Sequence, residues 1–200
     1  MSLIFSLLTH AILIFSVIFA LLQVRRWSRY WPLAYVFSSI VVVIPIGCWL
    51  LLEFSKGYFS DLSLLTLMLL VLYLTGAIRQ KRHAYDTSLK IVVLCLAAFL
   101  YPASLGLGMF DSYALGFSSH YNYDILIISI ASLGIVAWYT GAIQLAIYIM
   151  LALLAHGFQV YESTNLWDYL LDPIGVVICF ISLLFAMLKK LYSKIMFKRI

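Results

Sequence analysis

The sequence predicts an all-α fold, a single polytopic bundle of membrane-spanning helices that takes up residues 1–200. Hydrophobic residues make up 65% of the chain, charged residues make up 10%, and the mean hydropathy is +1.07. A water-soluble domain of this size cannot bury so much apolar side chain, so the solvent of the fold must be lipid. The apolar residues also fall into runs separated by short polar segments, which is typical of an integral membrane protein.

Seven such apolar segments follow one another along the chain. We expect spans at approximately 3–23, 32–53, 62–78, 89–105, 125–139, 142–157 and 168–188. No basic region precedes the first segment and arginines follow it, which is the reverse of a cleavable signal peptide, so we expect it to be retained. Pro32 suits the first turn of the second span, and Pro45 within that span predicts a kink.

The basic residues predict the orientation. If the N-terminus lies outside, all but one of the 13 lysines and arginines face the cytoplasm, as the positive-inside rule requires. The exception is Lys56. The cytoplasmic set is Arg25, Arg26, Arg29, Arg79, Lys81, Arg82, Lys90, Lys189, Lys190, Lys194, Lys198 and Arg199. We therefore expect a multi-pass protein of a bacterial-type inner (plasma) membrane, with a cytoplasmic C-terminus. Because topology explains the net charge of +5, we expect lipid rather than nucleic acid as the partner.

One ambiguity concerns the segments 125–139 and 142–157. Each is shorter than the hydrocarbon core of about 30 Å, so they form either two tilted spans or one re-entrant hairpin beside five spans. We favour seven spans, because Trp138 and Tyr139 resemble an anchor at the inner interface.

The ionisable residues gather on the predicted outer side. Seven of the eight acids and three of the four histidines lie there, many of them in or near the long break at 101–124. Carboxylate and imidazole groups together suit acid–base catalysis or metal binding, although acids near helix starts are also expected from the helix dipole alone. The catalytic candidates are Asp111, His120, Asp124, Asp168 and Asp172, and the metal-ligand candidates are His120, His156 and Glu162.

Three local strings have open interpretations. In the string 165–173, Asp172 has two interpretations. It either contacts a substrate or ion inside the membrane, or it begins a helix that has Pro173 in its first position. Pro173 also frees a backbone carbonyl about one turn earlier. The string 110–117 resembles a tight loop in which Gly116 permits a positive φ, although its aromatics also suit an interface belt. His10 and His156 raise the possibility of a haem, but no partner spacing supports one, and the sequence identifies no cofactor.

Three functions remain in view. The first is an accessory or assembly subunit of the cell envelope, because catalytic motifs are absent from the sequence and small-residue pairs such as Ala137 with Gly141 favour helix association. The second is an enzyme that acts on a lipid-linked substrate at the outer leaflet. The third is a small transporter that uses Asp172 and the proline-broken spans.

Overall fold

The structure is a computed structural model that describes residues 2–24, 30–46, 49–79, 85–107 and 110–197. Seven of the predicted cytoplasmic basic residues lie outside these ranges, namely Arg25, Arg26, Arg29, Lys81, Arg82, Lys198 and Arg199. The described chain is helical apart from its connections and one small hairpin, so the all-α prediction is confirmed.

In the first half of the chain, the described residues form four α-helices. These are α1 (Ser2–Leu21), α2 (Trp31–Val42), α3 (Leu51–Phe59) and α4 (Leu64–Ile78). Between α2 and α3, strand β1 (Pro45–Ile46) pairs antiparallel with strand β2 (Trp49–Leu50). The predicted helical span 32–53 is therefore wrong in its second half, since α2 ends at Val42 and is about 18 Å long. Pro45 does not merely kink the helix: it disfavours helical geometry in the preceding residue and lacks an N–H, so the chain turns into the hairpin.

The part of the second half that the structure describes forms five α-helices and a short 3-10 turn. They are α5 (Thr87–Ser104), η2 (Ala114–Gly116), α6 (Tyr123–Tyr139), α7 (Ile143–Gly157), α8 (Leu166–Leu170) and α9 (Pro173–Phe197). The last predicted span, 168–188, is thus two helices, because the chain is extended at Leu171 and α9 begins only at Pro173. The other predicted segments agree with helices to within a few residues at each end.

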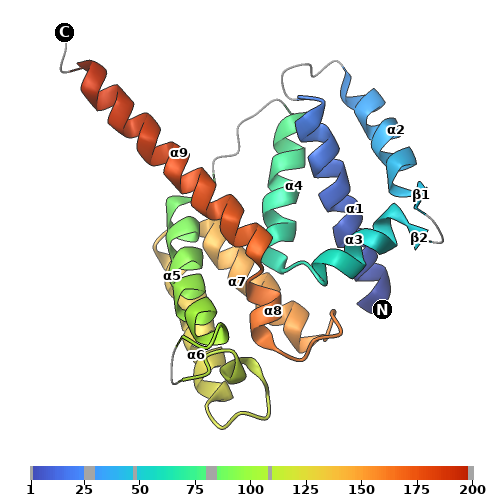
Figure 1. The fold of residues 1–200 in the computed structure, drawn as a ribbon. Helices are drawn as coiled ribbons and strands as arrows, with labels where there is room; N and C mark the ends of the chain where they lie inside the picture. Colours follow the sequence, from blue (N-terminus) through green and yellow to red (C-terminus); the bar gives the residue numbers. More distant parts are fainter. Residues whose placement is uncertain (1, 25–29, 47–48, 80–84, 108–109, 198–200) are drawn as a thin grey trace.

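The long helices run alternately up and down between two ends of the molecule (Figure 1). One end holds the N-terminus, α3, α8 and the loop between α5 and α6, and the other holds the turn between α6 and α7 and the C-terminal part of α9. Helix α4 packs against α1 on one side and against α7, α8 and α9 on the other, so it joins the two halves of the chain. The most tilted helix is α9, whose C-terminal part projects away from the bundle.

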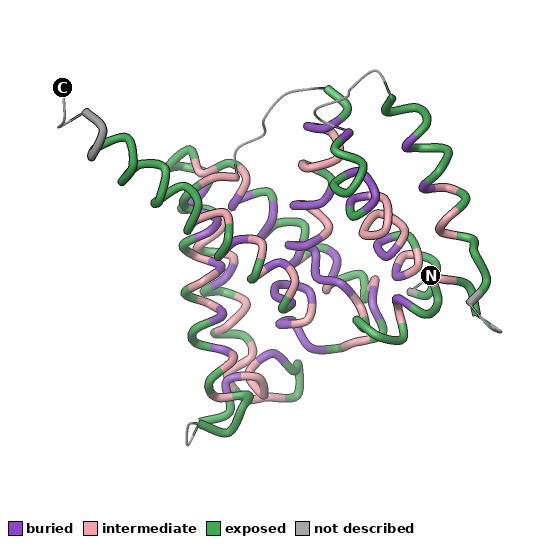
Figure 2. The backbone as a smooth tube through the Cα atoms, turned by 45° about the horizontal axis from the view of Figure 1, so that its top comes forward, coloured by how far each residue is buried: buried purple, intermediate pink, exposed green. Residues whose placement is uncertain are grey.

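The core lies where these helices face one another (Figure 2). Its largest fully buried side chains include Leu65, Leu89, Tyr148, Trp167 and Tyr169. The outward faces carry many exposed Leu, Ile, Val and Phe side chains, which a bilayer would cover. Within the described ranges, three helices are long and apolar enough to cross a membrane, namely Leu3–Leu21, Thr87–Ser104 and Pro173–Lys194, and this composition indicates a membrane-associated protein.

Candidate functional site

Two strings that lie far apart in the sequence, 111–117 and 165–168, dock onto each other. The Asn165 side chain donates to the carbonyl of Tyr113 at 3.0 Å, and the Trp167 indole donates to the carbonyl of Ser112 at 2.9 Å. The Tyr113 hydroxyl lies 3.0 Å from both carboxylate oxygens of Asp168. Asn165 also caps α8, since its oxygen accepts from the backbone N–H of Trp167 at 2.9 Å.

Gly116 allows this docking to be so close. A Cβ atom at position 116 would lie 1.9 Å from Oδ1 of Asn165 and 2.6 Å from Cδ1 of Trp167. The reason for the glycine is therefore close approach rather than a positive φ. Asp111 shapes the other side of the loop, because its Oδ1 accepts from the N–H groups of Tyr113 and Ala114 and starts the η2 turn. The string 111–117 is thus a tight loop, and Asp111 and Asp168 both make structural contacts in it.

The phenol of Tyr113 is held as a donor in this contact. Partial burial and, after it, the negative charge of Asp168 raise the pKa of Tyr113 to about 12. At neutral pH the phenol is therefore protonated and donates to the carboxylate of Asp168.

Asp172 lies between the N-termini of two helices. One carboxylate oxygen accepts from the N–H of Ser63 at 2.8 Å, and the other accepts from the Thr66 hydroxyl and from the N–H of Gly175, both at 2.6 Å. The first two donors belong to the start of α4 and the third to the start of α9, so two helix dipoles and three donors stabilise the buried charge. This geometry agrees with the interpretation of Asp172 as a helix start.

The carbonyl of Leu170, the last residue of α8, is also satisfied. The hydroxyl of Tyr148, a fully buried residue of α7, donates to it at 2.5 Å. A side chain from a third helix thus closes the break between α8 and α9.

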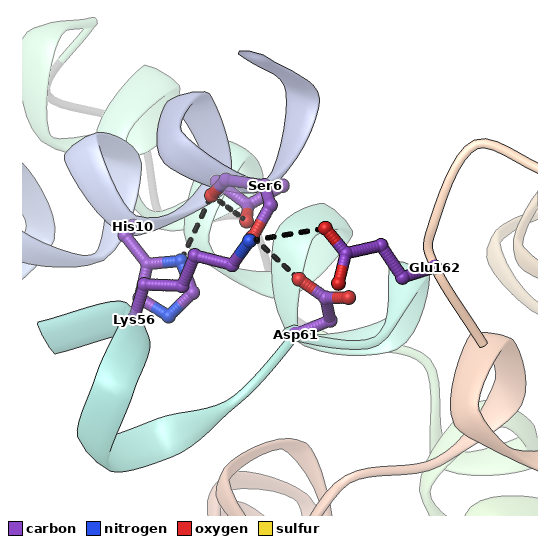
Figure 3. Close-up of polar contacts among 6 residues, drawn as sticks. Ser6, His10, Lys56, Asp61 and Glu162 are labelled. Carbon is purple, nitrogen blue, oxygen red and sulfur yellow. Dashed lines mark hydrogen bonds and ion pairs between the residues drawn. The ribbon is translucent and has the colours of Figure 1, made fainter. Parts of the chain in front are cut away.

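A second polar cluster links α1 to the loops at the same end of the molecule (Figure 3). The Ser6 hydroxyl donates to Asp61, and the Lys56 ammonium pairs with Glu162 at 3.7 Å. His10 is fully buried, and its Nδ1 donates to the carbonyl of Ser6 at 2.8 Å. No described residue bonds to its Nε2.

His156 and Tyr123 border an open groove where α6 begins and α7 ends. The groove has a volume of about 380 Å³. The Tyr123 hydroxyl lies 3.3 Å from Nδ1 and 3.4 Å from Nε2 of His156, and Nε2 lies 3.3 Å from the carbonyl of Thr164. These distances are at the long limit for hydrogen bonds, so the imidazole keeps capacity for a further partner. The ring is held in place by an edge-to-face contact with Tyr169, with centroids 5.1 Å apart.

The remaining candidates lie apart from this groove. His120 accepts from the backbone N–H of Asn122 and stacks on Tyr121, while Asp124 is exposed in the first turn of α6. Among the described residues, no three His, Cys, Asp or Glu side chains lie close enough to hold a metal ion. The structure therefore does not assemble the metal set of His120, His156 and Glu162. Nothing links His10 to His156 as a haem pair either, because His10 bonds within α1 and His156 faces α6 and the 158–165 loop.

Comparison with protein families, with curated proteins and with solved structures finds no match to this chain. The site is therefore interpreted from its own residues alone.

The sequence pattern does not single out Tyr123 as a site residue, because aromatic residues near the ends of membrane helices are expected at the interface in any case. A signal for it exists in the chain. Residues equally distant from the turn at Thr140 and Gly141 lie at the same level when α6 and α7 pair antiparallel, and this rule places Tyr123 level with Phe158, two residues beyond His156.

Proposed function

We propose that this chain is a multi-pass protein of the bacterial-type inner membrane that crosses it seven times, with the N-terminus outside and the C-terminus in the cytoplasm. The crossings are α1, α2, α4, α5, α6, α7 and α9, and α3 and α8 lie at the outer surface. The alternating direction of these helices supports this topology (Figure 1). So do the charges, since Lys56 belongs to α3, whereas Lys189, Lys190 and Lys194 lie in the last turns of α9.

Cysteine labelling tests the topology with a matched pair. Tyr121 and Tyr139 are both 85% exposed and flank the two ends of α6. In a variant whose native Cys48, Cys95 and Cys179 are replaced by serine, Tyr121→Cys should react with an impermeant maleimide added to intact cells. Tyr139→Cys should react only after the membrane is opened. Labelling of both positions in intact cells would contradict two crossings by α6 and α7.

Within this topology, we propose that the protein is an accessory or assembly subunit that packs against another membrane protein through α9. The observation that supports this proposal is the low burial of α9. Of the residues in its most apolar 18-residue stretch, 11% are buried against the rest of the chain, whereas the corresponding share for α1 is 39%. Every residue from 184 to 194 is exposed. Close packing of side chains drives helix association in lipid. A helix that packs so little against the rest of its own chain therefore leaves a surface on which a second protein can pack.

Photo-crosslinking in living cells tests this role. A photoreactive residue in place of Phe185, which is 68% exposed on α9, should give a discrete adduct with one membrane protein. The matched control is Ile128, which is 64% exposed on α6 and should give no such adduct. Equal adducts from both positions, or adducts with lipid alone, would contradict the accessory role.

An enzyme acting on a lipid-linked substrate at the outer leaflet is the second candidate. The groove beside His156 favours it, because it brings an imidazole and a phenol together at an open surface. A transporter that uses Asp172 gains no comparable support, since both oxygens of that carboxylate already accept hydrogen bonds.

A further inference from the structure

The groove beside His156 continues along the membrane-facing side of α6 and α7. A second cavity, of about 290 Å³, runs on from it toward Trp138, and Leu153 lines both. The close approach of Gly134 to Ile149, where a Cβ would lie 3.0 Å from Cγ2 of the isoleucine, lies along this second cavity. The two cavities therefore follow one seam between α6 and α7, from the outer surface to the other end of the helix pair.

The two ends of this seam differ in chemistry. Its outer part is lined by polar side chains, namely Ser118, Tyr123, His156, Gln159 and Thr164. From Ile127 and Leu153 onward the lining is apolar, and it includes Ala131, Met150 and Trp138. A polar head followed by an apolar channel matches an amphiphile and suits neither a water-soluble ligand nor a purely apolar one.

The polar end also indicates the class of headgroup. None of the described residues that line it is a lysine or an arginine, so it offers no cation to a phosphate group. Its hydroxyl, amide and imidazole groups can each donate or accept hydrogen bonds, which suits neutral hydroxyl groups.

We propose that the α6–α7 seam binds one outer-leaflet lipid with an uncharged, hydroxyl-bearing headgroup. The headgroup lies between Tyr123 and His156, and one acyl chain lies along Ala131 and Gly134 toward Trp138. Diacylglycerol and glycosylated diacylglycerol share this chemistry. The proposal requires that α6 and α7 lie in the membrane, but it does not depend on the partner proposed for α9.

Native mass spectrometry of the full chain in detergent tests the proposal. The protein is offered equal amounts of dioleoylglycerol, monoglucosyl-dioleoylglycerol, phosphatidylethanolamine and phosphatidylglycerol. We expect one bound lipid from the two hydroxyl-headgroup species, retained at least about tenfold more than either phospholipid, a difference of about 1.4 kcal/mol. The ratio of the two retained species tells whether the natural ligand carries a sugar.

Two substitutions on neighbouring positions test where the lipid lies. Ala131→Phe fills the seam and should reduce retention about tenfold, whereas Ser132→Phe adds the same ring at an exposed position outside the lining and should not. His156→Phe should remove the preference for hydroxyl headgroups while it keeps the ring contact with Tyr169. If that variant does not fold, Gln159→Leu at the exposed rim tests the same preference.

Equal retention of all four lipids, or equal retention by Ala131→Phe and Ser132→Phe, would overturn the proposal, because both results indicate nonspecific surface lipid. Preferential retention of phosphatidylglycerol would overturn the assignment of an uncharged headgroup.

Discussion

The carboxylate of Asp172 and the imidazole of His156 are two ionisable groups near the same end of the molecule in opposite situations. Asp172 is 8% exposed, and its two oxygens accept three hydrogen bonds of 2.6–2.8 Å. His156 is partly exposed on an open groove, and its contacts are 3.3–3.4 Å long. The hydrogen bonds of an acid inside an apolar segment can thus all be made within the fold, as at Asp172. The imidazole of His156, whose contacts are long, can still bind a ligand.

The largest effect is expected at Asp172. Asp172→Ala leaves three donors without their acceptor at the junction of α4 and α9, which should destabilise the protein by roughly 3–5 kcal/mol, because hydrogen bonds to a buried charge contribute about 1.5–3 kcal/mol each and do not add fully. Thermal unfolding in detergent measures the loss. Asp124→Ala is the matched control, since Asp124 is exposed and should change stability by no more than about 0.5 kcal/mol. Equal effects of the two substitutions would show that Asp172 does not hold the two helices together.

The next effect is expected at Gly116, where the 111–117 loop meets α8. Gly116→Ala places a methyl group 1.9 Å from Asn165, so the loop must move away and stability should fall by about 1–3 kcal/mol. Limited proteolysis should also cut the loop more quickly. Gly57→Ala is the control, because nothing lies within 4 Å of a Cβ at that position. A Gly116→Ala protein as stable and as resistant as Gly57→Ala would contradict the docked loop.

The loop contact should also respond to alkaline pH. The pKa of Tyr113 is raised from 10.0 to about 12 in the folded protein, so its stabilising effect is complete below pH 10 and is lost as the pH rises through about 12. Tyr113→Phe should therefore be less stable than the parent by about 1 kcal/mol at pH 8, with a difference that disappears near pH 12. Thermal midpoints of both proteins across this range provide the measurement. A difference that stays constant with pH would show that the phenol does not act through Asp168.

Part of this arrangement could be predicted from the sequence, because it depends on local chemistry. Apolar runs located most of the helices. A helix start at Asp172 and Pro173 was one of the two interpretations of that pair, and α9 does begin at Pro173. The partners of Asp172 could not be predicted, since Ser63 and Thr66 lie 109 and 106 residues away in the chain. The same holds for the docking of Tyr113 on Asp168, which are 55 residues apart. Apolar patterns give the depth of a residue in the membrane, but they do not say which helices are neighbours.

The hairpin at Pro45 was missed for a different reason. The run from 32 to 53 is largely apolar, so composition alone favours one long span. Proline disfavours helical geometry in the residue before it, and this backbone restriction ends the helix ahead of Pro45, so α2 stops at Val42. In a lipid solvent, where apolar side chains are acceptable almost anywhere, a single backbone constraint therefore has more influence on helix ends than hydrophobicity does.

The smallest effect on stability is expected at His156, and it sharpens the comparison with Asp172. His156→Phe removes only long hydrogen bonds and keeps the ring against Tyr169, so the free energy of unfolding should change by less than about 1 kcal/mol. The same variant should lose its preference for hydroxyl-headgroup lipids. Asp172→Asn should do the reverse, with a lower thermal midpoint and an unchanged lipid preference in the fraction that folds. If His156→Phe unfolds as readily as Asp172→Ala, the imidazole belongs to the structural framework, and the distinction between the two groups fails.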